Sequence, residues 1–445
     1  MGRYAGQKML VAGLGASGVS AVRYLLAQGA EVHVWDATRS PPKLMEVSDK
    51  IYSENNFCGQ NITDLQLEPY VAGVLSPGIS LDSELAQALQ KAGVEIIGDI
   101  ELFAREANAA GVPVIGITGS NGKSTVTTLV GEMAKAAGLR VGVGGNLGPP
   151  ALDLLRDDAQ LYVLELSSFQ LETTRSLRCK AATILNLSQD HLDRHGTMAH
   201  YGQVKARIWS GCEVAVANRD DVAVMERAPR GCVTFGLDAP QQGHYGLVEH
   251  EGQMWLAAGA TRLVPNDALK IFGLHNAVNA LAALALADAA GISRAASLNA
   301  LRTFAGLPHR CEFVAKIAGV DYFNDSKGTN VGSTLAALNG LPAPIVWLAG
   351  GQGKGQDFSE LREPLARKGR IAILFGEDAA RIEHDVAGAL PVYREANMNA
   401  ALSRARVLAQ PGDRVLLSPA CASFDQFKSY VDRGEQFRAV VRRLA

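Results

Sequence analysis

The sequence predicts an α/β protein made of three domains with largely parallel sheets. The chain has 445 residues, which at about 150 residues per domain corresponds to roughly three domains. Short apolar runs alternate with helical patterns from one end of the chain to the other. These runs are continuously apolar, as in the strands of a parallel sheet that helices cover on both faces.

The elements follow this alternation in order. The first repeat comprises a predicted strand at residues 8–13, a helix at 18–28 and a second strand at 31–36. Further strands are predicted at residues 112–118, 161–166, 181–187, 345–351, 371–376 and 414–420. The segment 231–265 is less periodic, and we expect an antiparallel excursion there. Breaks near Gly98 and Gly306 predict domains at residues 1–98, 99–306 and 307–445.

Composition excludes several classes of function. The chain is 47% hydrophobic and 20% charged, and its net charge of −2 gives no basic field for a dedicated nucleic-acid binder. Its six cysteines lack metal-binding spacing and indicate free thiols in a reducing compartment. The apolar stretch Ala280–Ala287 is too short to cross a bilayer, and the N-terminal apolar run leads directly into a glycine loop. We expect a cytoplasmic protein without membrane insertion or a nucleic-acid partner.

The strongest local motif is GITGSNGKST at residues 116–125, between a predicted strand and a predicted helix. Glycines allow backbone N–H groups to surround phosphate oxygens, and the helix N-terminus adds its positive dipole end. Lys123 can then reach the β- and γ-phosphates, and the Ser124 hydroxyl can approach Mg²⁺. The strict motif has glycine where this chain has Ile117, so a chance glycine-rich turn is the alternative. The strand–loop–helix context favours binding of a nucleoside triphosphate.

A second glycine loop lies at the N-terminus. Gly13, Gly15 and Gly18 form G-x-G-x-x-G, and Asp36 ends the following predicted strand. This pattern is typical of dinucleotide binding, with the acidic residue on a ribose hydroxyl. A UDP-sugar would satisfy the same requirement for a diphosphate at a helix N-terminus, and so short a pattern also occurs in turns without a ligand. The loop alone leaves these alternatives open.

Polar side chains follow the later predicted strands. Glu165 ends one strand and could ligate a metal beside the phosphate loop, because sites of α/β proteins form at the carboxyl ends of strands. Asn186, Asp190, His191 and Asp193 follow the next strand, where helix capping and a structural histidine are the alternatives. Further polar bursts at residues 309–310, 324–329, 350–354 and 418–427 suit a dicarboxylate, although any one of them could be a solvated loop.

Taken in order, these strings resemble the Mur ligases, the ATP-dependent amide ligases of peptidoglycan precursor synthesis. The strings are GITGSNGKST, LELSSFQLE, DHLDRH, the helix around Lys205, LPHRCEF, NDSKGTN and SPACASFDQF, which together cover nearly the whole chain. SSFQLE, NDSKGTN and SFDQF most resemble the members that add D-glutamate to UDP-N-acetylmuramoyl-L-alanine. The resemblance implies a Rossmann-like domain for UDP, a central P-loop ATPase-type domain and a C-terminal Rossmann-like domain. It implies amide formation through an acyl phosphate and a tetrahedral intermediate, and we expect a monomer whose C-terminal domain closes.

The resemblance also implies roles for individual residues. Residues expected to bind the UDP-substrate are Gly15, Ser17, Asp36, Ser76, Asn146, Ser167, Ser168 and Gln170. Residues expected to bind ATP are Gly119, Asn121, Gly122, Lys123, Ser124, Thr125, Asn276, Asn279, Arg310 and Asp325. Residues expected to bind D-glutamate are Lys327, Thr329, Lys354, Ser423 and Tyr430.

The catalytic group implied by the resemblance consists of Lys123, Glu165, His191 and Lys205. Two Mg²⁺ sites are expected, one held by Ser124 and Glu165 and a second by His191. Lys205 would be carboxylated by CO₂ to a carbamate that ligates or orients the metal. By itself, Lys205 would be interpreted as a solvated lysine on an amphipathic helix.

The sequence is also compatible with three functions other than D-glutamate ligation. Another amide ligase of the same family would differ only in its amino acid. An NAD-dependent oxidoreductase would account for the first glycine loop but would leave the phosphate loop without a purpose. A nucleotide-binding regulatory protein would leave Glu165, His191 and Lys205 unexplained.

Overall fold

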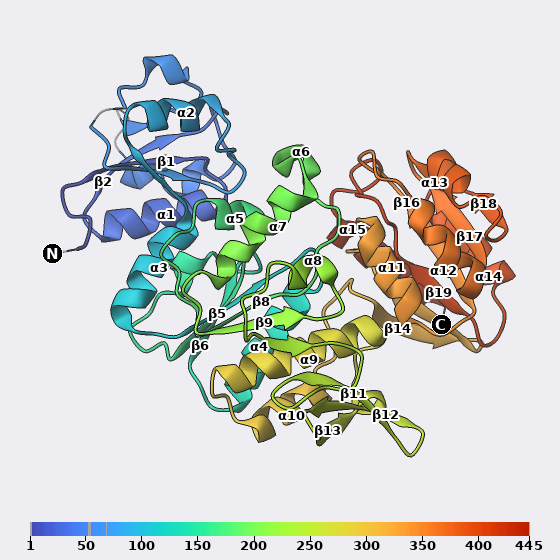
Figure 1. The fold of residues 1–445 in the computed structure, drawn as a ribbon. Coiled ribbons are helices and arrows are strands. Elements are labelled where there is room, and N and C mark those ends of the chain that lie inside the picture. The colour runs from blue at the N-terminus through green and yellow to red at the C-terminus, as the bar shows by residue number, and fades with distance from the viewer. Residues whose placement is uncertain (1, 52–54, 68, 445) are drawn as a thin grey trace.

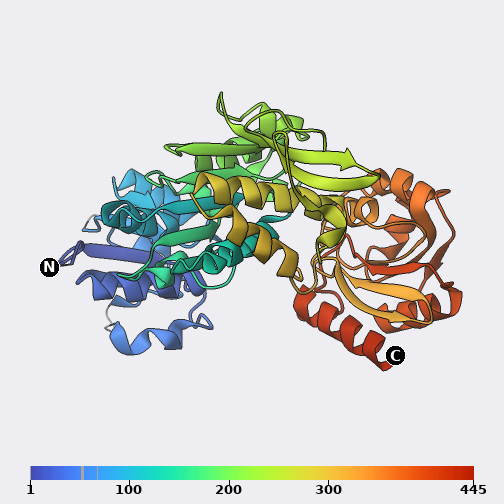
Figure 2. The same cartoon turned by 90° about the horizontal axis from the view of Figure 1, so that it is seen from below.

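In the computed structural model, which describes residues 2–51, 55–67 and 69–444, the strands form three separate sheets in succession along the chain (Figures 1 and 2). Helices follow most of the strands, and the pairing within each sheet is mainly parallel. The predicted α/β class is therefore confirmed.

The N-terminal sheet has four parallel strands in the order β2-β1-β3-β4. Its elements are β1 (Lys8–Ala12), α1 (Ala16–Ala27), β2 (Glu31–Trp35), β3 (Ala72–Leu75), α2 (Glu84–Lys91), β4 (Glu95–Ile97) and the following helix α3 (Asp99–Ala110). The strand order reverses direction between β1 and β3. Ligands of open α/β sheets bind at such a point, outside the carboxyl ends of the strands.

The central sheet has the order β13-β12-β11-β10-β9-β8-β5-β7-β6. Its strands are β5 (Val114–Thr118), β6 (Val141–Gly145), β7 (Leu161–Glu165), β8 (Ala181–Ile184), β9 (Val214–Asn218), β10 (Val233–Phe235), β11 (Tyr245–His250), β12 (Gln253–Ala258) and β13 (Thr261–Pro265). Its helices are α4 (Lys123–Ala136), α5 (Ser168–Glu172), α6 (Leu192–His195), α7 (Met198–Ala206), α8 (Val222–Met225), α9 (Leu274–Ala289) and α10 (Arg294–Thr303). Strands β11, β12 and β13 pair antiparallel, which confirms the expected excursion.

The C-terminal sheet has the order β14-β15-β19-β16-β17-β18. Its elements are β14 (Glu312–Ile317), β15 (Val320–Asn324), α11 (Val331–Gly340), β16 (Ile345–Gly350), α12 (Arg362–Lys368), β17 (Gly369–Phe375), α13 (Ala379–Asp385), β18 (Val392–Arg394), α14 (Met398–Leu408), β19 (Arg414–Leu417) and α15 (Tyr430–Leu444). Strand β14 pairs antiparallel with β15. The apolar-run analysis missed this hairpin because no residue of β14 is fully buried and Phe313 and Lys316 are exposed, so the strand lacks a continuous apolar run.

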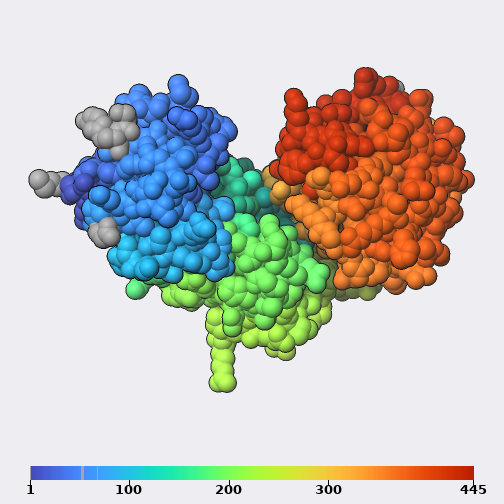
Figure 3. Space-filling view, turned by 90° about the horizontal axis from the view of Figure 1, so that it is seen from above, coloured from blue at the N-terminus to red at the C-terminus, as the bar shows by residue number. Residues whose placement is uncertain are grey.

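The N-terminal and central sheets share a hydrophobic core, whereas the C-terminal sheet has its own. One core cluster joins N-terminal residues such as Val11 and Val34 to central residues such as Tyr162 and Leu164. Among the described residues, no core cluster joins the central sheet to the C-terminal sheet, whose clusters lie within residues 311–441. Figure 3 shows the N-terminal and C-terminal parts standing apart above the central part. No helix in the described part of the chain is long and apolar enough to cross a bilayer.

Candidate active site

The phosphate loop joins β5 to α4 at the carboxyl edge of the central sheet. Gly122 adopts a left-handed φ of 85°, and a Cβ there would lie 2.5 Å from Asn279 Oδ1, so glycine is required. The Lys123 ammonium turns back and donates to the carbonyl oxygens of Gly119 at 2.8 Å and Ser120 at 2.9 Å. Burial lowers the pKa of Lys123. The cation is therefore placed over its own loop, where phosphate oxygens could replace the two carbonyls.

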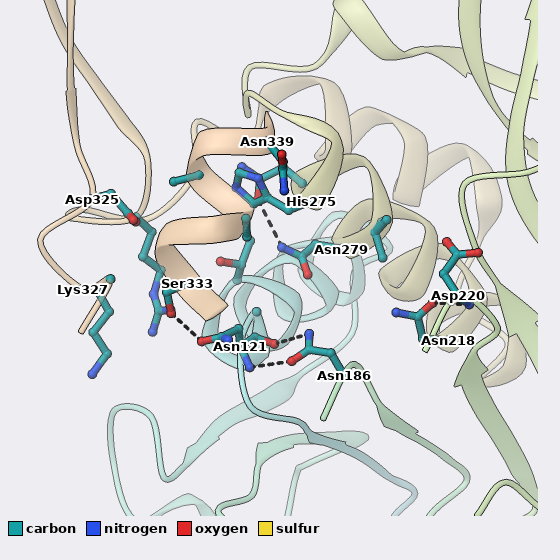
Figure 4. Close-up of a pocket in the computed structure, with 18 of the residues that line it drawn as sticks. Asn121, Asn186, Asn218, Asp220, His275, Asn279, Asp325, Lys327, Ser333 and Asn339 are labelled. Atoms are coloured by element: carbon teal, nitrogen blue, oxygen red, sulfur yellow. Dashed lines mark hydrogen bonds between the residues drawn. The ribbon is translucent and has the colours of Figure 1, made fainter. Parts of the chain in front are cut away.

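Asn186 supports the phosphate loop from the end of the neighbouring strand β8. Its Oδ1 accepts a hydrogen bond from Asn121 N at 2.8 Å, and its Nδ2 donates to Asn121 O at 3.0 Å (Figure 4). Ser120 Oγ donates to Ser188 O at 3.0 Å. The amide of Asn186 thus holds the backbone of Asn121 on both sides of its Cα.

Glu165 ends β7, next to β5 in the sheet, and its side chain is 3% exposed. Its Oε1 accepts a hydrogen bond from Asn146 Nδ2 at 2.6 Å. Its Oε2 is buried without a hydrogen-bond partner in the described structure. A buried carboxylate oxygen without a partner is costly unless something binds it, and a hard cation such as Mg²⁺ prefers this ligand. The residues therefore fit a metal here, although no three His, Cys, Asp or Glu side chains of the described chain converge as a complete ligand set.

Lys205 is buried on α7, with only 2% of its surface exposed. Its Nζ donates to Thr118 Oγ1 at 3.2 Å and to Gly119 O at 3.0 Å, and it lies 4.7 Å from the ring centroid of Tyr201. Burial and the neighbouring Lys123 ammonium lower the pKa of Lys205 well below that of an ordinary lysine. Lys205 is therefore part of the phosphate-loop cluster, in contrast to the solvated lysine that its helix alone suggested.

His191 lies at the start of α6 in a left-handed conformation, with φ of 54°. Its ring centroid is 4.8 Å from that of Phe169, and its Nε2 is 3.6 Å from Asp190 Oδ2. Partial burial of the ring lowers the pKa of His191, although 47% of the side chain is exposed. This shift favours the neutral imidazole, which can act as a ligand through nitrogen.

A cavity of about 560 Å³ lies between the central and C-terminal domains (Figure 4). The residues predicted to bind ATP that line it are Asn121, Gly122, Thr125, Asn276, Asn279, Arg310 and Asp325. Lys327, which was assigned to D-glutamate, also lines it, as do the unanticipated residues His275, Asn218 and Asp220. The cavity thus gathers side chains from both domains around the phosphate loop.

Two contacts connect the C-terminal domain directly to the phosphate loop. Arg310 Nη2 donates to Ser124 Oγ at 2.7 Å, and Ser333 Oγ donates to Asn121 Oδ1 at 2.6 Å. Asp325 Oδ2 accepts a hydrogen bond from Ser418 Oγ at 2.7 Å, and burial raises the pKa of Asp325 to about 7.

The first glycine loop lies at the point where the N-terminal sheet reverses order. Gly18 packs so closely that a Cβ would lie 1.9 Å from Gly13 O, which also accepts a hydrogen bond from Ser76 Oγ at 2.6 Å. Asp36 Oδ2 accepts from Leu14 N at 2.8 Å, so Asp36 shapes the loop. A cavity of about 300 Å³ beside the loop includes Gly13 and Asp36 in its lining. Gly15 and Ser17 begin α1 and are outside this lining.

The other residues expected at the UDP-substrate lie on the central domain. Asn146 is bonded to Glu165, as described above. Ser167 and Gln170 form a capping box at the start of α5, and Ser168 Oγ is 2.9 Å from His195 Nε2. These three sets of hydrogen bonds lie on the central domain, a different domain from the first glycine loop.

The residues expected to bind D-glutamate lie on neighbouring loops of the C-terminal domain. Lys327 Nζ is 4.1 Å from the ring centroid of Tyr430, and Ser423 is buried. Lys354 is exposed and has a left-handed φ of 51°. Thr329 N donates to Lys327 O at 2.8 Å. The loops follow β15, β16 and β19, which are neighbours in the sheet.

Sequence reasoning missed two buried charged groups near these sites. Asp99 begins α3, where this helix packs against α1 and α5, and both of its carboxylate oxygens are buried without a hydrogen-bond partner. Arg433 is fully buried on α15, in line with Phe437 and Val441. The spacing i, i+4, i+8 on one helix face would have revealed an arginine among core positions.

The chain matches three family profiles in succession. These are the Mur ligase MurD-like N-terminal domain over residues 7–98, the Mur ligase middle domain over residues 117–287 and the Mur ligase glutamate ligase domain over residues 309–421. The UDP-N-acetylmuramoylalanine–D-glutamate ligase of Legionella pneumophila (strain Lens) is 48% identical over 445 residues, covering 98% of this chain and 99% of that protein. The enzyme of that name from Pseudomonas aeruginosa is 50% identical over 448 residues, covering 98% of each chain.

Solved structures with the same fold share less sequence. A pseudomurein peptide ligase type C from Methanothermus fervidus has a TM-score of 0.62 at 18% identity, covering 99% of this chain and 100% of that chain. MurF from Acinetobacter baumannii has a TM-score of 0.62 at 19% identity, covering 99% and 91% of the two chains. At this level of identity the likeness concerns the fold alone.

Proposed function

The chain belongs to the Mur ligase family, and from this we propose that it joins D-glutamate to UDP-N-acetylmuramoyl-L-alanine with conversion of ATP to ADP and phosphate. The observation that carries the choice of amino acid is the 48–50% identity, over nearly the full length, to ligases named for these substrates. The reaction belongs to peptidoglycan precursor synthesis. We place it in the cytoplasm, in agreement with the free thiols of all six cysteines.

The chemistry requires activation of a carboxylate, because its carbonyl is a poor electrophile at neutral pH. The alanyl carboxylate attacks the γ-phosphorus of ATP, and the bond to the bridging oxygen of ADP breaks to give an acyl phosphate. The D-glutamate amine then attacks the carbonyl carbon, and the tetrahedral oxyanion collapses with loss of inorganic phosphate and a proton. Positive charge from Lys123 and Arg310 beside the phosphate loop opposes the negative charge that accumulates in both steps.

We assign Mg²⁺ to Glu165 and Ser124 at one site and to His191 at a second. The uncompensated Oε2 of Glu165 and the lowered pKa of His191 support this assignment. Bound Mg²⁺ would neutralise phosphate oxygens and orient the γ-phosphoryl group. Lys205 would carry a carbamate, because its buried amine with lowered pKa is nucleophilic towards CO₂ and lies beside the phosphate loop.

We assign the sugar nucleotide to the first glycine loop together with Asn146, Ser167, Ser168 and Gln170. A substrate bound there would cross the contact between the N-terminal and central domains and reach Glu165. Lys327, Thr329, Lys354, Ser423 and Tyr430 would hold D-glutamate on the C-terminal domain. All three binding regions lie within one chain, which supports a monomer; light scattering at assay concentration would measure the oligomeric state.

Phosphate release tests the proposed function directly. With ATP, Mg²⁺ and UDP-N-acetylmuramoyl-L-alanine, we expect release with D-glutamate and not with L-glutamate or meso-diaminopimelate. Equal release with all three amino acids, or none with any, would contradict the assignment. Quenching of nicotinamide fluorescence by the protein would instead favour the oxidoreductase alternative.

Binding of D-glutamate is expected to weaken as the pH rises above 8. Burial lowers the pKa of Lys327 to about 8, and the positive charges of the nearby Arg310 and Lys123 contribute to the shift. The Lys327 ammonium is therefore charged below this pH and loses its charge above it. Glutarate has both carboxylates but no amine, and therefore isolates this effect from titration of the substrate amine. Its inhibition constant should rise above pH 8 by up to about tenfold per pH unit.

The matched variant for this experiment is Lys327→Arg, whose guanidinium stays charged throughout the range. Its inhibition constant for glutarate should show no such rise. The same pH dependence in the variant and in the unaltered protein would show that another group is responsible.

A further inference from the structure

Arg433 is the buried cation of the C-terminal domain that the proposed mechanism does not use. Its side chain is fully buried on α15, and within the described part of the chain no carboxylate forms an ion pair with it. Helix α15 packs tightly against His309 at this point, because a Cβ on Gly434 would lie 2.2 Å from His309 Nδ1. Asn324 Nδ2 also donates to Gly434 O at 3.2 Å. Arg433 therefore has little freedom to move towards solvent.

The guanidinium donates to three loops. Nε donates to Ser326 Oγ at 3.0 Å and Nη2 to Ser326 O at 2.8 Å, in the loop after β15. Nη2 also donates to Cys421 O at 3.1 Å, and Nη1 contacts Ala422 O at 3.5 Å, in the loop after β19. Nη1 is 3.4 Å from Gly350 O, at the end of β16. The planar fork of arginine is suited to joining acceptors from several segments.

Each of these loops carries a residue assigned to D-glutamate. Ser326 precedes Lys327, Gly350 begins the loop that contains Lys354, and Ala422 precedes Ser423. The loops after β16 and β19 are also paired, with Gln352 N donating to Ala422 O at 3.0 Å and Ala422 N to Gln352 O at 2.9 Å. Lys327, Lys354 and Ser423 therefore lie on loops whose backbone carbonyls accept hydrogen bonds from Arg433 or lie close to it.

A hydroxyl continues the connection to Tyr430. Ser326 Oγ accepts from Arg433 Nε and donates to Tyr430 O at 2.8 Å. Because its single proton is used towards Tyr430, the hydroxyl has a defined orientation. Lys327 lies against the Tyr430 ring, so Arg433 and Ser326 together fix both members of this pair.

We propose that Arg433 is the positioning residue of the D-glutamate site, which it builds by joining the three loops and to which it contributes a positive charge. The inference rests on the proposed function, since it concerns the binding of that amino acid. Arg433 is a positioning residue and not a catalytic one, because its donors face the loop carbonyls.

The charge of Arg433 is retained at neutral pH. Burial lowers the pKa of Arg433 to about 10, which leaves the group protonated at pH 7. A cation without a bonded carboxylate attracts an anion more strongly inside a protein than in water. The loops that Arg433 joins carry the side chains assigned to the two carboxylates of D-glutamate, so binding of D-glutamate should depend on Arg433 more than the binding of ATP or the sugar nucleotide does.

The test compares Arg433→Met and Arg433→Lys with Arg442→Met, which removes an exposed arginine from the last turn of the same helix. The KM for D-glutamate should rise about 10- to 100-fold in Arg433→Met, as for other residues that orient binding groups. Arg433→Lys keeps the charge but not the planar fork and should lie between Arg433→Met and the unaltered protein. The KM values for ATP and for UDP-N-acetylmuramoyl-L-alanine should stay unchanged, and Arg442→Met should match the unaltered protein throughout.

A lower Tm with an unchanged KM for D-glutamate would overturn the proposal, because a purely structural arginine would have that effect. If Arg433→Met does not fold, Ser326→Ala removes only the hydroxyl link and should raise the same KM by a smaller factor. An unchanged KM in folded Ser326→Ala would also overturn the proposal. Failure of the proposed function is distinguishable, because the unaltered protein would then release no phosphate in response to D-glutamate.

Discussion

Replacing Lys123 with methionine is expected to lower kcat about 10³-fold, as for other groups aimed at developing negative charge. The Lys123 ammonium donates at 2.8 Å and 2.9 Å to two carbonyls of its own loop, so it stands over the space that phosphates would occupy. Methionine fills similar volume but can neither donate a hydrogen bond nor carry charge. Phosphate release at saturating concentrations of all three substrates measures the effect.

Lys135→Met is the control for this variant. Lys135 lies in the last turn of the same helix, α4, where its exposed ammonium pairs with Glu132 Oε1 at 2.8 Å. We expect its kcat to match the unaltered protein, since the phosphate loop is at the opposite end of the helix. A Lys123→Met variant that folds and keeps full activity would exclude the phosphate loop as the catalytic ATP site.

Replacing Lys205 with glutamine is expected to lower kcat about 10²- to 10³-fold and to remove a carbamate signal. An amine must be neutral to add to CO₂, and the addition forms an N–C bond with release of one proton. Lys205 is 2% exposed, and its burial lowers the pKa of the ammonium well below the ordinary value, which favours the neutral amine. Carbon-13 NMR in labelled bicarbonate should show a carbamate resonance in the unaltered protein that is absent from Lys205→Gln.

Lys180→Gln provides the matched comparison. Lys180 is half-exposed and pairs with Glu213 Oε2 at 2.5 Å, so its loss should change neither the resonance nor kcat. A carbamate resonance that persists in Lys205→Gln would assign the modification to another amine. Loss of activity without any carbamate resonance in the unaltered protein would leave Lys205 as an unmodified donor to the phosphate loop.

The sequence predicted those features that depend on local pattern. Continuous apolar runs identified the buried strands, and the glycines around Lys123 identified the phosphate loop, because both follow from backbone geometry over a few residues. Glu165 could be placed at the site because a parallel strand delivers the residue at its carboxyl end to a known edge of the sheet. The antiparallel excursion of residues 245–265 was visible as a loss of periodicity.

Features that depend on contacts between distant segments could not be predicted in this way. Arg433 meets Ser326, 107 residues away, and nothing within either segment identifies the other. Asn186 was predicted only as part of a polar group after a strand, and the structure shows that its amide shapes the phosphate loop. Lys205 looked like a solvated lysine from its helix alone, and only the tertiary fold shows that its amine is buried.

The core shared by the first two domains has a consequence for biosynthesis. Residues near the N-terminus, such as Val11, complete their core with partners as far along the chain as Val224. During translation from the N-terminus, the first sheet can pair its strands early but cannot bury its outer face until those later residues have emerged from the ribosome. The C-terminal domain, whose clusters draw only on residues 311–441, can acquire its core afterwards and independently. We therefore expect the nascent chain to mature in two cooperative steps, although it contains three sheets.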